Sequence, residues 1–122
     1  MVLLCGAAQA EEPKYTPAYT TCQEKSGGVD QSMLDCIKVE YQVQDKKLND
    51  TYRQLMASLP ATGRTALKTS QRDWLKSRQS TCEFHFKVAG GTMANLITQS
   101  CYLDATAERV GRLSYWKTLK AD

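Results

Sequence analysis

Residues 30–60 read DQSMLDCIKVEYQVQDKKLNDTYRQLMASLP, and the spacing of their apolar side chains decides the fold class. The apolar positions recur at intervals of three, four or seven, as one face of a helix requires. They are Leu34, Ile37, Tyr41, Leu48, Tyr52, Leu55 and Leu59. The stripe skips a turn at Gln44 and Asp45, which predicts a polar layer at the core or at its edge. Asp30 is expected to cap this helix, and Pro60 ends it because the residue before a proline avoids the α region.

Two more helices are expected, from about residue 61 to residue 88 and from about residue 92 to residue 119, separated by Gly90-Gly91. Their inward candidates are Leu67, Gln71, Trp74, Leu75, Arg78 and Cys82 on the first, and Met93, Ile97, Cys101, Leu113 and Trp116 on the second. No alternating pattern indicates a strand, and the short connections make the helices antiparallel neighbours. The predicted fold is therefore all-α, a compact bundle of three long antiparallel helices after an irregular segment, residues 11–29.

The composition indicates one globular domain, because 122 residues suit a single core and 42% of them are hydrophobic. Sixteen Lys and Arg residues against 13 Asp and Glu give a net charge of +3, which is too weak for a nucleic-acid-binding signature. A single histidine excludes a site built from several histidines, and no cofactor or stable membrane insertion is expected. The composition thus favours a small protein that is not an enzyme.

Residues 1–10 read MVLLCGAAQA and are similar to the end of a secretory signal peptide. A short apolar run precedes the small residues Ala8 and Ala10, which flank Gln9 as a cleavage site requires. We interpret this stretch as a signal peptide remnant. Cleavage after Ala10 would leave a single domain of residues 11–122 and would remove Cys5.

Four cysteines remain after this cleavage, and an even number in a short exported chain predicts disulfides. Of the three possible connectivities, the local one pairs Cys22 with Cys36 and Cys82 with Cys101. The second pair fits a hairpin of the second and third helices. The alternative is a zinc site with four thiolates, although such sites usually have closely spaced cysteine pairs.

Several short motifs follow one another along the chain. They are Leu48-Asn49-x-x-Tyr52, Gln71-x-x-Trp74-x-x-x-Arg78-x-x-x-Cys82, Gly90-Gly91-Thr92, Cys101 and Thr106-x-x-Arg109-x-x-x-Leu113. This ordered set resembles the lysozyme inhibitor LprI N-terminal-like family of small exported bacterial proteins, from about Cys22 to Leu113. The resemblance implies a helical domain with the two local disulfides and a periplasmic, secreted or other envelope location. It also implies inhibition of lysozyme, or immunity against secreted wall-degrading toxins, as in related domains.

The motif side chains also have a structural interpretation. It covers Leu48, Asn49, Tyr52, Gln71, Trp74, Arg78, Thr106 and Arg109. A buried arginine needs a partner, because an unpaired buried charge is very costly. The candidate partners of Arg78 are the carboxylates of Asp45, Asp104 and Glu108. The alternative interpretation is a site for a carboxylate, or for a sugar stacked on Trp74.

A basic row on the second helix is the most distinctive surface feature. Arg64, Lys68, Arg72 and Lys76 follow one another at intervals of four. The row is either a solvated face or a docking surface for an acidic partner or an anionic envelope polymer. A docking row of this kind raises association rates in a salt-dependent manner.

No catalytic residue is expected, because His85 lacks a recognisable nucleophile and orienting group and the carboxylates show no paired spacing. The resemblance therefore predicts a periplasmic binding protein that inhibits a peptidoglycan hydrolase by occlusion. The target is a lysozyme-like enzyme or a secreted wall-degrading toxin, so the partner is a protein. The alternatives are an envelope adaptor or structural protein without a hydrolase target, and a binder of small ligands.

Overall fold

The computed structural model describes residues 14–119, and this part of the chain forms four helices and no strand. The helices are α2 (Pro17–Lys25), α3 (Asp30–Ser58), α4 (Ala61–Ala89) and α5 (Met93–Leu119). The all-α fold class and the three long helices are as expected, but the described residues form a fourth, shorter helix as well. The predicted signal peptide remnant, residues 1–10, lies outside the described residues.

The expectation that residues 11–29 form an irregular segment is wrong, because α2 occupies much of it. Thr16 is the N-cap of α2, and its hydroxyl accepts a hydrogen bond of 3.2 Å from a first-turn amide. Pro17 follows in the first turn, where its fixed φ suits a helix and its missing N–H costs nothing. The Thr-Pro pair was thus the signal in the sequence for this helix.

The ends of α3 differ in how they are stabilised. Its N-cap is Val29, which makes no side-chain capping bond, so Asp30 lies in the first turn and does not cap the helix as expected. A carboxylate in the first turn still interacts favourably with the helix dipole. At the other end Leu59 is extended before Pro60, as the sequence predicts, and its carbonyl accepts a hydrogen bond of 2.6 Å from Arg64.

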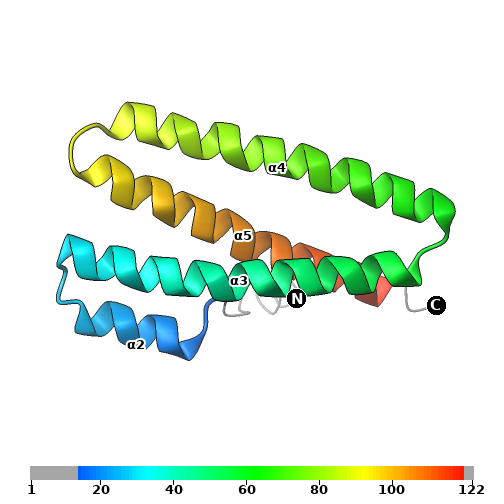
Figure 1. Cartoon of the computed structure of the whole chain (residues 1–122), viewed down its shortest axis with the longest axis horizontal. Helices are drawn as coiled ribbons and strands as arrows, with labels where there is room; N and C mark the ends of the chain where they lie inside the picture. Colours follow the sequence, from blue (N-terminus) through cyan, green and yellow to red (C-terminus); the bar gives the residue numbers. More distant parts are fainter. Residues whose placement is uncertain (1–13, 120–122) are drawn as a thin grey trace, which may run out of the picture.

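Helix α5 packs against both α3 and α4, whereas α3 and α4 make few contacts with each other (Figure 1). One cluster of the hydrophobic core consists of Leu48, Leu55, Leu67 and Leu113, each 6% exposed or less. The connections from α2 to α3 and from α4 to α5 lie at the same end of the bundle (Figure 1). At the α4–α5 turn, Gly90 and Gly91 have φ of 66° and 61°, a conformation that side chains with a Cβ rarely adopt. No helix between residues 14 and 119 has an apolar stretch that would span a bilayer.

Some residues that were expected to face the core are exposed, because no neighbouring helix covers them. Leu75 and Met93, which were expected to face inward, are 42% and 47% exposed. Leu75 is exposed because α3 and α4 diverge, and Met93 because it is the first residue of α5. Leu103 and Ala107 were missed although they are 0% and 5% exposed. Helix α5 buries side chains against two neighbours, so its buried face is wider than a single stripe.

The skipped turn in the apolar stripe of α3 is where α2 is attached. Gln44 and Glu40 are 1% and 2% exposed. The Glu40 carboxylate accepts hydrogen bonds from the Thr16 amide (2.8 Å), the Thr16 hydroxyl (2.7 Å) and the Gln44 amide (2.9 Å). Gln44 also donates to the carbonyl of Lys14. A carboxylate at the start of α2 satisfies an amide that the helix itself leaves unpaired.

We expect Glu40→Gln to weaken the attachment of α2 to α3 by about 1–3 kcal/mol. The carboxylate accepts three hydrogen bonds, whereas an amide replaces one of its two acceptor oxygens with an NH2 donor. Amide hydrogen exchange should accelerate in α2 and remain slow in the centre of α3. The control is Glu24→Gln, an exposed change on α2 itself. Equal exchange rates in α2 for Glu40→Gln and the parent protein would show that this carboxylate does not hold the helix.

Candidate functional site

The four predicted disulfide cysteines form the two local bridges. Cys22 is bonded to Cys36 with a Cα–Cα distance of 5.8 Å, and Cys82 to Cys101 with 5.6 Å. The first bridge links α2 to α3, and the second links α4 to α5. All four thiols are consumed, so the alternative of a four-thiolate zinc site is excluded. Cys82 is fully buried, so the second bridge is also part of the packed interior.

Neutral groups on α3 and α5 hold the Arg78 side chain of α4. Its Nη1 donates hydrogen bonds to the Thr106 hydroxyl (2.9 Å) and the Tyr41 hydroxyl (3.2 Å). Its guanidinium carbon lies 4.9 Å from the centroid of the Trp74 ring and 5.4 Å from that of Tyr102. Such cation–π contacts strengthen when water is excluded from them.

Arg109 approaches the same tryptophan from α5. Its guanidinium carbon lies 5.4 Å from the Trp74 centroid and 5.1 Å from that of Trp116. Its Nε donates to Gln71 (2.9 Å) and its Nη2 to Ser70 (3.0 Å), both on α4. Burial, and to a smaller extent the charge of the nearby Arg112, lowers the pKa of Arg109. The guanidinium nevertheless stays charged at neutral pH, because an arginine pKa is so high.

The expectation that a carboxylate pairs with Arg78 is wrong. Asp104 and Glu108 lie on the side of α5 that faces the segment before α2, where they bind the side chains of residues 14–15. Burial, together with the hydrogen bond to Asp104, raises the pKa of the Tyr15 hydroxyl. Asp45 accepts a hydrogen bond from its own helix. The sequence placed Asp104 and Glu108 on α5 but did not show which neighbouring element their side chains face.

Two guanidinium groups therefore surround Trp74, and no ion pair between residues 14 and 119 neutralises either of them. The predicted motif residues Gln71, Trp74, Arg78, Thr106 and Arg109 form one network that links α4 to α5. Both guanidinium carbons lie within 5.4 Å of the Trp74 centroid, so a sugar stacked on a face that they occupy would have to displace them.

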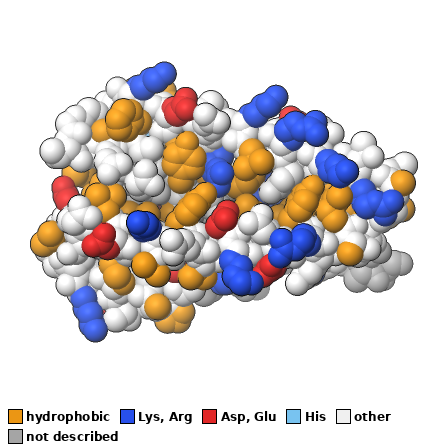
Figure 2. Space-filling model, viewed as in Figure 1, with side chains coloured by type: hydrophobic (Ala, Val, Ile, Leu, Met, Phe, Trp, Pro, Cys, Tyr) orange, Lys and Arg blue, Asp and Glu red, His pale blue; other side chains and the backbone are white. Residues whose placement is uncertain are grey.

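A groove of about 450 Å³ runs between α3 and α4, where the two helices diverge. We call it the α3–α4 groove. Its apolar lining comes from Leu48 and Tyr52 on α3 and from Leu75 on α4. Figure 2 shows hydrophobic side chains along the line between the two helices, with Lys and Arg side chains beside them. This groove was not predicted, because its existence depends on the angle between two helices.

Cations dominate the charged lining of the groove. Lys68, Arg72 and Arg78 line it from α4, and Asp45 is its single carboxylate. Two amide side chains, Asn49 and Gln71, complete the polar lining. The arrangement combines uncompensated positive charge, amide hydrogen-bonding groups and an apolar surface.

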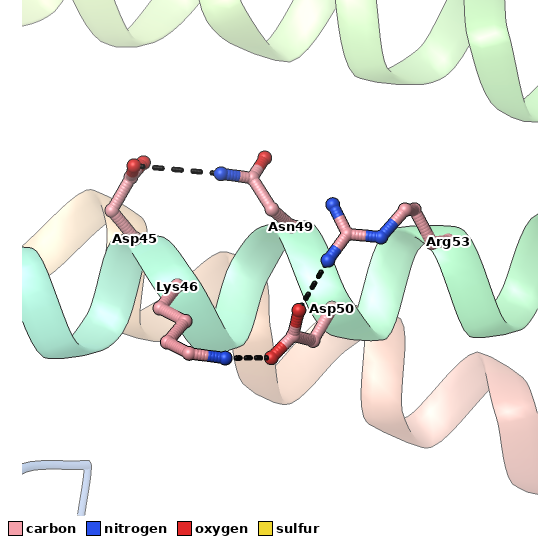
Figure 3. Close-up of polar contacts among 5 residues, drawn as sticks. All are labelled: Asp45, Lys46, Asn49, Asp50 and Arg53. Atoms are coloured by element: carbon pink, nitrogen blue, oxygen red, sulfur yellow. Dashed lines mark hydrogen bonds and ion pairs between the residues drawn. The ribbon is translucent and has the colours of Figure 1, made fainter.

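The polar side chains of residues 45–53 on α3 point in different directions (Figure 3). Asp45 and Asn49 project toward α4, and the Asn49 amide donates to the Asp45 carboxylate at 3.5 Å. Asp50 lies outside the groove, where it pairs with Lys46 at 2.8 Å and with Arg53. The hydrogen bond from Lys46 lowers the pKa of Asp50. The ion pairs of this stretch of α3 therefore do not neutralise the groove.

The structure divides the predicted basic row into three parts. Arg64 donates to the Leu59 carbonyl and so closes the end of α3. Lys68 and Arg72 line the groove, whereas Lys76 is exposed and does not line it. The motif residues divide similarly: Leu48 is in the core, and Asn49 and Tyr52 border the groove.

The fold and the disulfides define a small, disulfide-linked, all-helical protein. Residues 22–113 match the family model described as lysozyme inhibitor LprI, so the chain belongs to the LprI lysozyme inhibitor family. The resemblance noted in the sequence is thereby confirmed. An uncharacterized protein of Rhizobium meliloti (strain 1021) is 29% identical over 126 residues, which cover 92% of this chain and 87% of the relative. No solved structure gives a significant match.

Proposed function

We propose that this protein binds a peptidoglycan hydrolase in the bacterial envelope and inhibits it by occluding its cleft. Membership of the lysozyme inhibitor family over residues 22–113 is the observation that carries the proposal, since it implies a protein partner of the lysozyme type. The two disulfides support an exported location, because such bonds persist in oxidising compartments and are rare in the cytosol.

The scaffold suits an inhibitor because its surface is fixed before binding. Both bridges lie toward the end of the bundle where the α2–α3 and α4–α5 connections are found (Figure 1). Long helices with cross-linked ends lose little freedom when a partner docks. A preorganised surface therefore binds more tightly than a flexible one with the same contacts.

The charge of the protein favours some targets over others. The whole chain carries +3, and the α3–α4 groove concentrates three cations around one carboxylate. Like charge repels at long range and slows association. A strongly basic lysozyme is thus a poorer target than an acidic hydrolase or a wall-degrading toxin of another bacterium.

The test is a clearing assay on purified peptidoglycan with a panel of hydrolases that spans acidic and basic enzymes, egg-white lysozyme included. We expect the protein to slow at least one enzyme until one inhibitor is present per enzyme, and to co-elute with that enzyme in gel filtration. Acidic enzymes should be inhibited more strongly at low salt than at high salt. Unchanged clearing by every enzyme of the panel at a large molar excess of the protein would refute the proposed function.

A further inference from the structure

We propose that the α3–α4 groove is a carboxylate-binding site that takes an acidic segment of the target hydrolase. This inference rests on the proposed function and names the surface and the partner chemistry that it would use. The segment carries an aspartate or glutamate side chain for the cations of α4 and a neighbouring apolar side chain for the apolar lining.

The first argument is the unbalanced charge of Lys68 and Arg72. They lie one helical turn apart, where like charges mildly destabilise a helix. Three ion pairs occur between residues 14 and 119, and neither side chain takes part in any of them. Asp45, the carboxylate of the groove, is hydrogen-bonded to Asn49 and forms none of these pairs either. An anionic occupant would supply the missing opposite charge.

Arg78 adds a third positive charge at the same groove. Both of its hydrogen bonds leave from Nη1 and end on neutral hydroxyl oxygens. Its buried Nε has no hydrogen-bond partner in the described part of the chain. Because its neighbours are aromatic rings and hydroxyls, its charge is not neutralised and adds to the positive potential that the groove presents.

The apolar lining indicates what accompanies the acidic group. Leu75 is 42% exposed and lies in the groove with Leu48 and Tyr52. An apolar side chain of the partner would cover it. The amides of Asn49 and Gln71 lie in the same groove and can bond a partner backbone. A volume of about 450 Å³ is within the usual range for binding sites and accommodates a few residues of extended chain.

A wall glycan fits this groove less well than a peptide does. Sugars bind on open aromatic faces, and the best candidate, Trp74, is covered by two guanidinium groups and does not line the groove. The aromatic residue of the groove is Tyr52, which is half-buried and packs against the core. The family description also points to a protein partner.

The test compares two double variants that remove the same charge from the same helix. Lys68→Gln with Arg72→Gln neutralises the groove. Lys76→Gln with Lys87→Gln neutralises two exposed positions that do not line it. Circular dichroism should show that both variants are folded, because all four side chains are exposed.

The first measurement needs no hydrolase. An acetylated, amidated peptide Ala-Glu-Leu-Glu-Ala is titrated into the isotope-labelled protein, and amide shifts are followed by NMR. We expect shifts at groove residues, affinity weakened about tenfold in the groove variant, and affinity within about twofold of the parent in the control variant. The same peptide with glutamine in place of glutamate should cause no shifts in the groove. No shifts with the acidic peptide, or groove shifts only with an N-acetylglucosamine–N-acetylmuramic acid disaccharide, would overturn the proposal.

The second measurement is inhibition of whichever hydrolase the parent protein inhibits. The groove variant should inhibit it about tenfold less strongly than the control variant does. Equal inhibition by both variants would refute the groove as the contact surface and leave the proposed function intact. If the parent inhibits no enzyme, the proposed function fails and the hydrolase segment with it, whereas the peptide titration still decides whether the groove binds carboxylates.

Discussion

Trp74→Ala is expected to lower the free energy of unfolding by about 3 kcal/mol, the low end of the range for Trp→Ala in a core, because the ring is half-buried. The ring packs against the core cluster and lies beneath the guanidinium groups of Arg78 and Arg109. Its removal would leave a cavity between α4 and α5 and would deprive two poorly hydrated cations of their aromatic neighbour. Urea denaturation followed by circular dichroism at the helix band measures the loss.

Two controls show whether the loss of stability is specific to the Trp74 ring or follows from removing any aromatic side chain. Trp74→Phe keeps an aromatic face for the cations and should cost clearly less than Trp74→Ala. Tyr115→Ala removes an aromatic side chain of α5 that is 54% exposed, and should change stability by about 0.5 kcal/mol or less. A Trp74→Ala protein as stable as the parent but unable to bind its partner would reverse this assignment and make Trp74 a contact residue.

Replacing Cys82 and Cys101 together by alanine is expected to cost about 2–5 kcal/mol, the usual range for small exported domains. The bridge joins α4 to α5 across a sequence separation of 19, and Cys82 is fully buried. The loss therefore combines a less restricted unfolded chain with weaker packing at the turn. Denaturant unfolding of the variant, compared with the intact parent, gives the magnitude.

The bridge from Cys22 to Cys36 provides the matched comparison, since its sequence separation of 14 is similar. Its removal should mainly release α2, because this bridge attaches a short helix without buried residues to α3. Hydrogen exchange should then accelerate in α2 alone, whereas loss of the Cys82–Cys101 bridge should accelerate exchange in α4 and α5. Indistinguishable exchange patterns for the two variants would mean that the bridges do not act on separate parts of the molecule.

The three long helices were predictable because their signals are local. One apolar stripe ends at Pro60, and Gly90-Gly91 separates the next two helices. Helix α2 escaped this reasoning because it buries no residue completely, so it has no stripe to detect. Its signal is the N-cap and proline pair at Thr16 and Pro17, which reports on helix ends and not on burial.

The site was predictable only as a set of residues. The helical register places Trp74 and Arg78 on one face, but it does not determine what lies opposite them. The neighbours of Arg78 depend on the rotation of α5, which turns Asp104 toward the segment before α2 and Thr106 toward α4. The groove depends on the divergence of α3 and α4, and the spacing of residues along the sequence does not determine the angle between two helices.

The position of α5 also sets the order in which the molecule can assemble. Leu48, Leu55 and Leu67 belong to α3 and α4, which make few contacts with each other and are buried together with Leu113 of α5. A nascent chain that emerges N-terminus first has no finished interior until its last long helix has left the ribosome. Until then α3 and α4 have little apolar surface to bury against each other, so the core cluster forms only once the whole helical region is present.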